Sequence, residues 1–464
     1  MVQDLKNLSL AEKRKLAQQL LNQRIARAAQ NKEEIELPDY TRYTYDMFMF
    51  GSSPEPSEIE RFDDWVQATV DDHTYTFEVP RLQAQLPEND IYRTSHERIH
   101  VVNLSSYNYL GYGYHPDVIA AAKEALDIYG LGAASSPVAS GTFGLHKQLE
   151  RKLLEFFDLP DHGVSLFSSG YGVNSGSISA YMKQGGHIVM DRSVHMSILE
   201  GAQLSKCDPH YFNHNDVDHL EAILQDIQRS GPSRILVCIE GVYSADGDYS
   251  KTGRIVETAK RCGAKVLVDE AHSMLLVGPH GRGVCAEAGV LEEVDLLVLT
   301  FSKAFGGVGG ALYAPRKTAQ YINWYAKCRM FSCALDPAVT GGITKALELA
   351  SGSDGDERRE RLHRNASFLR ERLQGKVNIG SSESWIIPVI YGPEKFTLPL
   401  SDYVQRAGLD TSMMQFPAVG KNESRMRLFV TSEHSIEQLT HAAEIILRAA
   451  EKYGFTLNER GNFS

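Results

Sequence analysis

The chain has 464 residues, 42% of them hydrophobic, which is enough apolar material for a large core and more than one domain. Its formal net charge of −11 argues against nucleic acid as a main partner, because no wide basic field would hold phosphates. No apolar run approaches the length of a membrane span, and the polar N-terminus lacks the apolar core of a signal peptide.

The six cysteines are spaced irregularly along the chain, and none forms a C-x-x-C pair. Several of them lie within apolar stretches. This pattern predicts reduced, mostly buried thiols in a cytoplasmic protein, and neither a disulfide framework nor a zinc or other metal site.

Residues 1–98 are predicted to be an N-terminal extension. Ser9 followed by Glu12 makes a capping box, and apolar residues then recur at helical spacing, which predicts a helix within residues 1–30. The opposite face of that helix is basic, and is either a solvated face or a docking surface for an acidic partner. Residues 31–98 are rich in aromatic side chains, so we expect them to pack on the main body or across a subunit interface.

From residue 99 to 345, short apolar runs that end in polar residues alternate with amphipathic helical stretches. The apolar runs are 164–167, 187–190, 235–240, 265–269 and 296–300, and the helical stretches include 117–129, 145–158, 216–229 and 253–262. The alternation predicts an α/β fold with a mostly parallel central sheet that is covered on both faces. In such sheets the functional site lies at the carboxyl ends of the strands.

Residues 346–464 are predicted to form a smaller C-terminal α+β domain. Helices are expected at 355–374, 399–407 and 434–452, and strands at 384–391 and 425–431. Arg425, in the last of these strands, is expected to make a surface salt bridge.

Lys303 follows the apolar run 296–300 and stands beside the hydroxyls of Thr300 and Ser302. A lone lysine is more often a solvated surface residue. Here, however, an amine beside hydroxyls and glycines at a strand end suits a Schiff base to an aldehyde cofactor, with the hydroxyls binding its phosphate. Asp269 and His272 end another apolar run. An acid, a histidine and a lysine at strand ends together indicate a site for pyridoxal 5'-phosphate (PLP).

Three polar side chains suit the cofactor ring. A pyridinium nitrogen stays protonated only where an anion faces it, and Asp269 is the candidate, although it could also cap a helix. His272 and Ser244 could hydrogen-bond the phenolic oxygen of the ring, while Ser244 could equally cap a turn. His195 could stack on the ring and move a proton, or could be an ordinary packed histidine.

Ser169, Gly170 and Tyr171 follow an apolar strand and precede a predicted helix. A helix N-terminus offers free N–H groups and a positive dipole end, which suits a phosphate dianion. Small-residue turns are common, so this signal gains weight only from Thr300 and Ser302 at a second strand end.

Several blocks in the order of one family carry a resemblance over roughly residues 100–445. The blocks are Ser106 to Gly111, Ala139 to Thr142, Ser168 to Tyr171, Asp191 to Ile198, Tyr243 to Gly247, Asp269 to His272, Thr300 to Lys303 and Arg425 to Arg427. Together they resemble the α-oxoamine synthase family of PLP enzymes, whose members include serine palmitoyltransferases, 8-amino-7-oxononanoate synthases and 2-amino-3-ketobutyrate CoA ligases.

The resemblance implies PLP-dependent transferase fold type I, like that of aspartate aminotransferase, and a homodimer. It implies a decarboxylative condensation of an amino acid with an acyl thioester. Matching positions imply that Lys303 forms the Schiff base and that Asn108 and Arg427 hold the amino-acid carboxylate. The same matching gives the remaining cofactor contacts to His195, Asp269, His272, Thr300 and Ser302.

Some questions stay open at the level of sequence. The substrate could be serine, as the Ser106 to Gly111 block suggests, or alanine, glycine or another amino acid. Leu10 to Leu21 weakly resembles linker helices beside carrier-protein modules, so the acyl donor is either an acyl carrier protein or coenzyme A. The alternatives to a synthase are an aminotransferase of the same fold and a non-catalytic partner subunit, which should lack Lys303.

Overall fold

The computed structural model describes residues 56–94 and 96–458, which belong to one compact unit, Tyr43–Ser464. The helix predicted within residues 1–30 lies outside the described residues, as does much of the aromatic-rich stretch 31–98. Along the described part of the chain, no helix combines the length and the apolar character that a membrane crossing requires.

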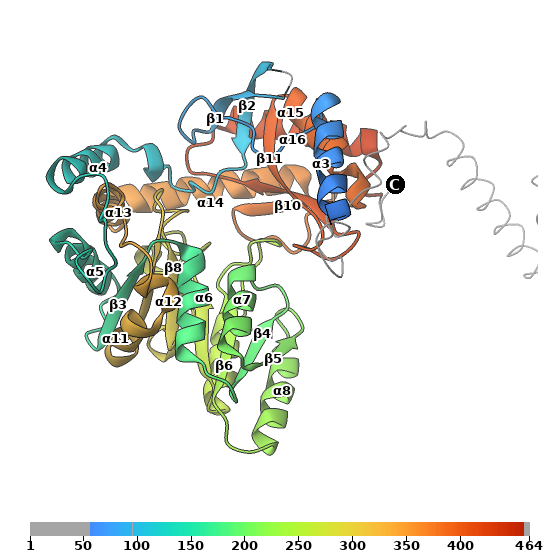
Figure 1. Ribbon diagram of the computed structural model, residues 1–464. Helices are drawn as coiled ribbons and strands as arrows, with labels where there is room; N and C mark the ends of the chain where they lie inside the picture. The colour runs from blue at the N-terminus through green and yellow to red at the C-terminus, as the bar shows by residue number, and fades with distance from the viewer. Residues whose placement is uncertain (1–55, 95, 459–464) are drawn as a thin grey trace, which may run out of the picture. The chain divides into compact units, whose positions relative to one another are not determined.

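A seven-stranded sheet forms the centre of the larger part of this unit (Figure 1). Its strand order is β3-β9-β8-β7-β6-β4-β5, and every pairing is parallel except the two that β9 makes. The strands are β3 (His162–Phe167), β4 (His187–Asp191), β5 (Asp208–Phe212), β6 (Ile235–Glu240), β7 (Lys265–Asp269), β8 (Leu296–Thr300) and β9 (Gly310–Pro315). The five predicted apolar runs are all strands, which confirms the mostly parallel sheet.

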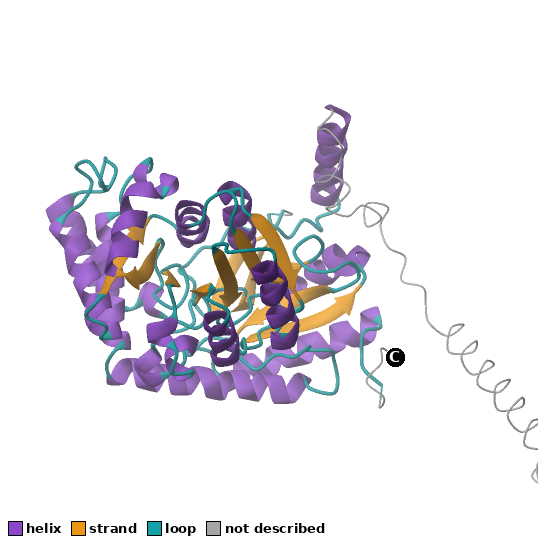
Figure 2. Cartoon of the chain, turned by 90° about the horizontal axis from the view of Figure 1, so that it is seen from below, coloured by secondary structure: helices purple, strands orange, loops and turns teal. Residues whose placement is uncertain are grey.

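Strands β6 to β8 are buried nearly throughout, so both faces of the sheet need a covering layer. Figure 2 shows helices around the strands. These helices are α4 (Pro116–Tyr129), α5 (Gly144–Phe157), α6 (Gly170–Tyr181), α7 (Met196–Ser205), α8 (Val217–Arg229), α9 (Thr252–Arg261), α10 (Val284–Glu287), α11 (Arg316–Tyr325), α12 (Lys327–Met330) and α13 (Pro337–Ala350). The predicted helices match α4, α5, α8 and α9.

A second, five-stranded sheet has the order β1-β2-β11-β12-β10. Its strands are β1 (Glu88–Tyr92), β2 (Arg98–Leu104), β10 (Ile386–Gly392), β11 (Leu409–Met414) and β12 (Ser424–Phe429), and its helices are α3 (Pro56–Asp71), α14 (Ser353–Leu373), α15 (Thr397–Arg406) and α16 (Ile436–Tyr453). Strand β2 pairs in parallel with β11, so a segment before the large sheet completes the C-terminal sheet. The predicted division at residues 98 and 345 stays a prediction.

An aromatic cluster joins the elements of the two sheets. Trp385 is fully buried, and its ring centre lies 6.0 Å from Tyr109, 5.4 Å from His363 and 6.5 Å from Tyr249. His363 lies on the long helix α14, which passes beside β10 (Figure 1). Because Tyr109 and Tyr249 lie on loops that follow β2 and β6, this packing fixes those loops.

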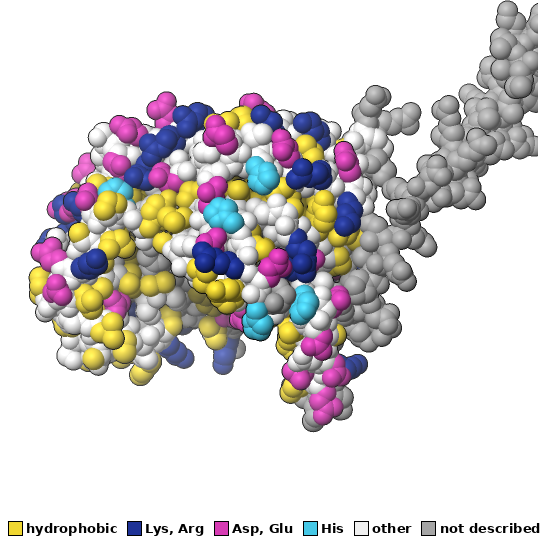
Figure 3. All heavy atoms as spheres, turned by 90° about the horizontal axis from the view of Figure 1, so that it is seen from above, with side chains coloured by type: hydrophobic (Ala, Val, Ile, Leu, Met, Phe, Trp, Pro, Cys, Tyr) yellow, Lys and Arg dark blue, Asp and Glu magenta, His cyan; other side chains and the backbone are white. Residues whose placement is uncertain are grey.

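Acidic and basic side chains are interspersed over the face that Figure 3 shows, and hydrophobic side chains lie between them. This distribution agrees with the mixed charge of the sequence. In the described residues we find no group of three or more His, Cys, Asp or Glu side chains that could hold a metal ion. All six cysteines are free thiols, and four of them are buried.

The turn after β8 requires glycine at position 306. Gly306 has a φ of 73°, and a Cβ there would lie 2.2 Å from the backbone nitrogen of Gly113. Gly289 has a φ of 70° and open space around it, so it isolates the cost of the backbone conformation. We expect Gly289→Ala to lower the free energy of unfolding by about 1 kcal/mol, and Gly306→Ala by about 2 kcal/mol more.

Urea denaturation of the two variants and the parent measures both effects. Equal losses of stability would contradict the close approach of residues 306 and 113.

Candidate active site

A cavity of about 300 Å³ opens at the carboxyl ends of the parallel strands. Nine of the residues that the sequence singled out line it: Ser169, Gly170, Tyr171, His195, Asp269, His272, Thr300, Ser302 and Lys303. They come from the ends of four strands, β3, β4, β7 and β8, or from the turns that follow them. The structure therefore brings together residues that lie up to 134 positions apart, from 169 to 303.

Parallel pairing places the charged groups of this cavity. Asp269 ends β7 and lies opposite Glu240 of β6 and Val298 of β8. Lys303 follows β8 by three residues and is half-buried. Burial lowers the pKa of Lys303 to about 8, although the carboxylates of Asp269 and Glu240 act in the opposite direction. The cavity thus holds an amine with an unusually large neutral fraction at neutral pH.

One hydrogen-bonded chain holds both Asp269 and His195. Asn174 Nδ2 donates to Asp269 Oδ2 at 2.6 Å and to Ser197 Oγ at 2.9 Å. Ser197 Oγ lies 2.8 Å from His195 Nδ1, and the Ser197 backbone N–H also donates to that nitrogen at 3.3 Å. Because Nδ1 accepts this bond, the neutral imidazole carries its proton on Nε2. The Oδ1 atom of Asp269 accepts the Ala271 N–H at 3.0 Å, so this carboxylate caps the turn after β7, and not a helix, because the next helical element of the described chain begins at Pro279.

The two histidines of the cavity differ in exposure. His272 is buried, and its Nδ1 lies 2.8 Å from the Tyr109 hydroxyl. Burial, and then the charges of Lys303 and Arg427, hold the pKa of His272 well below its usual range. His195 is exposed to the cavity, and Tyr171 approaches it edge-on with ring centres 6.1 Å apart. Burial lowers the pKa of His195 as well, so both rings are neutral at neutral pH.

The far end of the cavity is built to accept an anion. Helix α6 begins there at Gly170, and Ser169 caps it by accepting the Gly172 N–H at 3.0 Å. A Cβ on Gly170 would lie 2.3 Å from Thr300 Oγ1, so only glycine lets the helix start approach the end of β8. Free backbone N–H groups and the hydroxyls of Thr300 and Ser302 therefore converge on one place. These residues fit the phosphate of PLP.

Three predicted residues lie outside the cavity lining. The Ser244 carbonyl oxygen accepts a hydrogen bond from Arg427 Nη1 at 3.1 Å, while Arg427 Nη2 donates to Ser412 Oγ at 3.1 Å. The positive charge of Arg427 nevertheless reaches the cavity, because it lowers the pKa of Lys303 and His195. Asn108 Oδ1 accepts the Gly113 N–H at 3.1 Å and so supports the segment that contacts Gly306.

Arg425 makes the expected salt bridge from a β-strand, but the expected surface position is wrong. Its side chain is 4% exposed, and Nη1 lies 2.5 Å from Asp246 Oδ1. The residue is buried because β12 is an interior strand of its sheet, and the turn after β6 covers it.

Sequence reasoning missed three lining residues that act on the others: Asn174, Ser197 and Glu240. Glu240 is buried, and its Oε2 accepts the Ser244 N–H at 3.3 Å. Burial, together with the nearby charge of Asp269, raises the pKa of Glu240 to about 8. Its position at the end of the apolar run 235–240 was a visible signal. Asn174 and Ser197 gave none, because small polar residues are common in helices.

Comparisons with known proteins agree with this geometry. The family model for aminotransferase class I and II matches residues 99–446. The 8-amino-7-oxononanoate synthase of Alkaliphilus metalliredigens is 35% identical over 76% of this chain and 88% of its own length. The 2-amino-3-ketobutyrate coenzyme A ligase of Escherichia coli is 32% identical over 76% of this chain and 89% of its own length.

Solved structures give the same result. A serine palmitoyltransferase from S. paucimobilis, with bound PLP–myriocin, has a TM-score of 0.78 at 31% identity, and the match covers 85% of this chain and 99% of that one. The enzyme from Sphingomonas wittichii has a TM-score of 0.78 at 30% identity, over 86% and 99% of the two chains. The chain therefore belongs to the aminotransferase class I and II family and, within it, to the α-oxoamine synthases, which are PLP-dependent acyltransferases of fold type I.

Proposed function

We propose that this cavity carries the decarboxylative condensation of an amino acid with an acyl thioester, and that Lys303 is its central residue. In this reaction the α-carbon of the amino acid forms a bond to the acyl carbon. The acyl carbon–sulfur bond breaks, and the thiol leaves with a proton. The carboxyl group leaves as carbon dioxide, and the α-carbon takes a proton in its place. The products are an α-amino ketone, free thiol and carbon dioxide.

The observation that carries the proposal is a single cavity that is lined by the start of α6, by the Asp269 carboxylate and by the Lys303 amine, whose pKa is lowered. When bound, PLP supplies an aldehyde that condenses with amines and a ring that stabilises negative charge on the substrate. Lys303 Nζ would hold the aldehyde, and the Asp269 carboxylate would face the protonated ring nitrogen. Asn174 keeps Asp269 in place through its 2.6 Å hydrogen bond.

Other side chains would orient the cofactor. His195 is exposed toward the cavity and would cover one ring face, while His272, held by Tyr109, would face the phenolic oxygen. Ser244 is the second candidate for that oxygen. The start of α6, with Ser169, Gly170 and Tyr171, would bind the phosphate together with Thr300 and Ser302.

Lys303 Nζ is also the group that we expect to take the α-carbon proton of the amino acid. A pKa of about 8 leaves roughly a tenth of this amine neutral at pH 7, against less than a thousandth at the ordinary lysine value. Arg427 would bind the carboxylate, with Asn108 beside it. The Nε atom of Arg427 is buried and has no hydrogen-bond partner among the described residues, so this guanidinium keeps an unused donor, and a planar guanidinium suits a carboxylate.

Two alternatives make different products. An aminotransferase of the same fold would release a keto acid and would leave a thioester intact. A non-catalytic partner subunit would bind no cofactor covalently, and the presence of Lys303 with Asp269 and His195 in one cavity argues against it.

The proposed reaction predicts that the holoenzyme, given an amino acid and an acyl thioester, releases free thiol and carbon dioxide in equal amounts. A thiol reagent and trapped labelled carbon dioxide measure the two products, with a panel of amino acids that includes serine, alanine and glycine. Lys303→Ala should lower the rate by at least about a thousandfold, because both the attachment and the base are lost. A keto acid formed without thiol release would reject the synthase.

The lowered pKa of Lys303 predicts how cofactor attachment depends on pH. Only the neutral amine attacks an aldehyde, so the attachment rate should rise about tenfold per pH unit up to about pH 8 and then level off. An unperturbed lysine would keep gaining up to about pH 10.5. Visible absorbance after mixing the apoprotein with PLP gives the rate, and N-acetyl-lysine as a reference amine corrects for the cofactor itself.

Borohydride trapping followed by mass spectrometry locates the attachment. A rate that still rises between pH 9 and 10, or a label on a peptide without residue 303, would contradict the assignment.

We also propose that the acyl donor is bound to an acyl carrier protein. The support is the resemblance of Leu10 to Leu21 to linker helices beside carrier-protein modules. Turnover of one acyl chain on carrier protein should then exceed turnover of its coenzyme A thioester by at least about tenfold, and deletion of residues 1–30 should remove most of the difference. Equal rates with both donors, unchanged by the deletion, would leave coenzyme A as the donor.

A homodimer and a cytoplasmic location stay predictions. Leu131 and Phe331 are each 81% exposed, and Val308 at the cavity is 53% exposed, which supports a second copy of the chain as their cover. Light scattering should then give twice the 51.6 kDa of one chain.

A further inference from the structure

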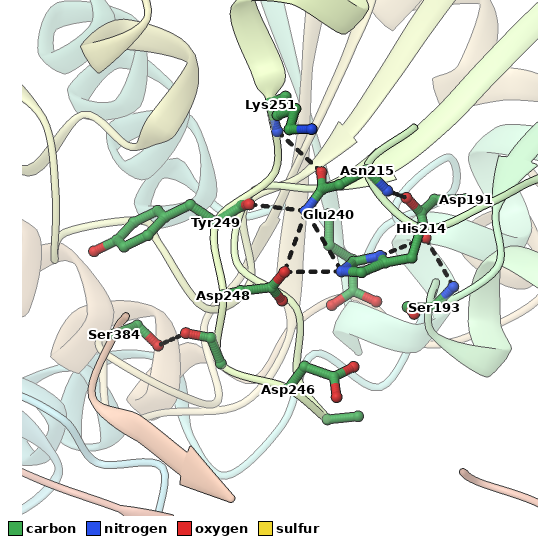
Figure 4. Close-up of polar contacts among 12 residues, drawn as sticks. Asp191, Ser193, His214, Asn215, Glu240, Asp246, Asp248, Tyr249, Lys251 and Ser384 are labelled. Atoms are coloured by element: carbon green, nitrogen blue, oxygen red, sulfur yellow. Dashed lines mark hydrogen bonds and ion pairs between the residues drawn. The ribbon is translucent and has the colours of Figure 1, made fainter. Parts of the chain in front are cut away.

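His214 lies between two carboxylates just outside the cavity (Figure 4). Its Nδ1 is 2.9 Å from Asp191 Oδ1, and its Nε2 is 2.8 Å from Asp248 Oδ2. The side chains of Asp191 and Asp248 are 0% and 9% exposed, while that of His214 is 29% exposed. Neither acid has another histidine, lysine or arginine partner among the described residues. One imidazole is therefore the shared cationic partner of two buried acids.

The three residues come from three neighbouring strand ends. Asp191 is the last residue of β4, His214 follows β5, and Asp248 lies in the loop after β6. Because β4 lies between β5 and β6 in the sheet, His214 reaches from the edge strand past the end of β4 to the loop beyond it. The imidazole thus links two loops that follow different strands.

The first of these loops carries His195. Asp191 Oδ1 also accepts the Ser193 N–H at 2.9 Å, and Asp191 Oδ2 accepts the Asn215 N–H at 2.9 Å. These bonds fix the short turn from 191 to 195, which ends where His195 caps α7. The position of the ring that faces the cavity therefore depends on the Asp191 carboxylate.

The second loop holds Arg427. The Tyr243 N–H donates to the Asp248 carbonyl at 3.0 Å, and the Gly247 N–H donates to the Tyr243 carbonyl at 2.9 Å, so residues 243–248 form a closed turn. The Ser244 carbonyl of that turn accepts from Arg427 Nη1 at 3.1 Å. The position of Arg427, which would bind the substrate carboxylate, therefore depends on the turn 243–248, which ends at Asp248.

Charge explains why a histidine stands here. Burial alone would lower the pKa of His214, but the hydrogen bonds to Asp191 and Asp248 raise it to about 10, so the ring is a cation at neutral pH. The Tyr243 ring meets it edge-on at 4.4 Å, and Asn215 Nδ2 also donates to Asp248 Oδ2 at 3.2 Å. A neutral side chain at 214 would leave two buried acids facing each other without a cation.

We propose that His214 is a positioning residue that fixes where His195 and Arg427 lie relative to each other. It does so by binding the carboxylates of Asp191 and Asp248. It contacts neither the cofactor cavity nor the substrate, and it acts through the two loops. This inference rests on the proposed function, because it assigns the ring face to His195 and the substrate carboxylate to Arg427.

Single substitutions can separate the effect of Asp191 on His195 from the effect of Asp248 on Arg427. Asp248→Asn keeps the pair of His214 with Asp191 and loosens the loop that holds Arg427. We expect it to raise the apparent Kd of the amino acid about tenfold, read from the change in cofactor absorbance when the amino acid is added without thioester. Asp191→Asn should lower kcat about tenfold with a smaller change in amino-acid binding. His214→Asn should show both effects, and all three should keep the KM of the thioester within about twofold.

His210→Asn is the matched control. His210 lies on β5, and its Nε2 is 3.0 Å from His187 Nδ1, away from the cluster, so we expect wild-type binding and rate. Should His214→Asn not fold, the two single carboxylate variants still decide the question.

Lower melting temperatures with unchanged amino-acid Kd and kcat would overturn the proposal, because they would leave His214 a purely structural residue. Arg427→Lys separates this failure from a failure of the proposed function. If Arg427→Lys binds the amino acid as well as the parent does, the role of Arg427 is wrong. If only Arg427→Lys loses affinity and Asp248→Asn does not, the positioning role is wrong.

Discussion

The parallel pairing of β6, β7 and β8 is the constraint on which the site depends. It places Glu240 opposite Asp269, and it brings the turn that carries Lys303 to the same edge of the sheet. A buried amine between buried acids is costly unless the charges compensate one another or the amine is neutral. The sheet therefore creates a place where a lysine with a lowered pKa is stable, and that amine is what an aldehyde cofactor needs.

Three histidines near this edge show how environment sets charge. His272 is buried and has no acidic partner in the described part of the chain, so burial keeps it neutral. His195 faces the cavity and is also neutral, because burial lowers its pKa although the nearby charge of Asp269 acts in the opposite direction. His214 is partly exposed, and two carboxylates make it a cation. Neutral rings suit contact with a cofactor ring, whereas a cation suits the structural task of joining two acids.

Sequence alone predicted the strands whose carboxyl ends carry site residues, because the apolar run and the polar residues that follow it are adjacent in the chain. It did not predict β5, which is short and polar, or the pairing of β2 with β11, which lie far apart in the chain. It also missed β9, although that strand is apolar and follows β8 directly. Of the site, Lys303 and Asp269 were predictable from strand ends. Asn174 was not, because its importance arises only when α6 packs beside β7 and brings its amide to the Asp269 carboxylate.

The proposed substrate-binding arginine lies on the second sheet, so the distance between it and Lys303 is not set by any single sheet. Arg427 belongs to β12, and what ties it to the larger sheet is a backbone carbonyl, that of Ser244. Arg425, two residues earlier on the same strand, pairs with Asp246 and so binds the same turn. A carbonyl takes its position from the backbone, so the accuracy of the carboxylate site rests on how firmly the turn 243–248 is held. Selection can adjust that turn through side chains, such as His214, that never meet the substrate.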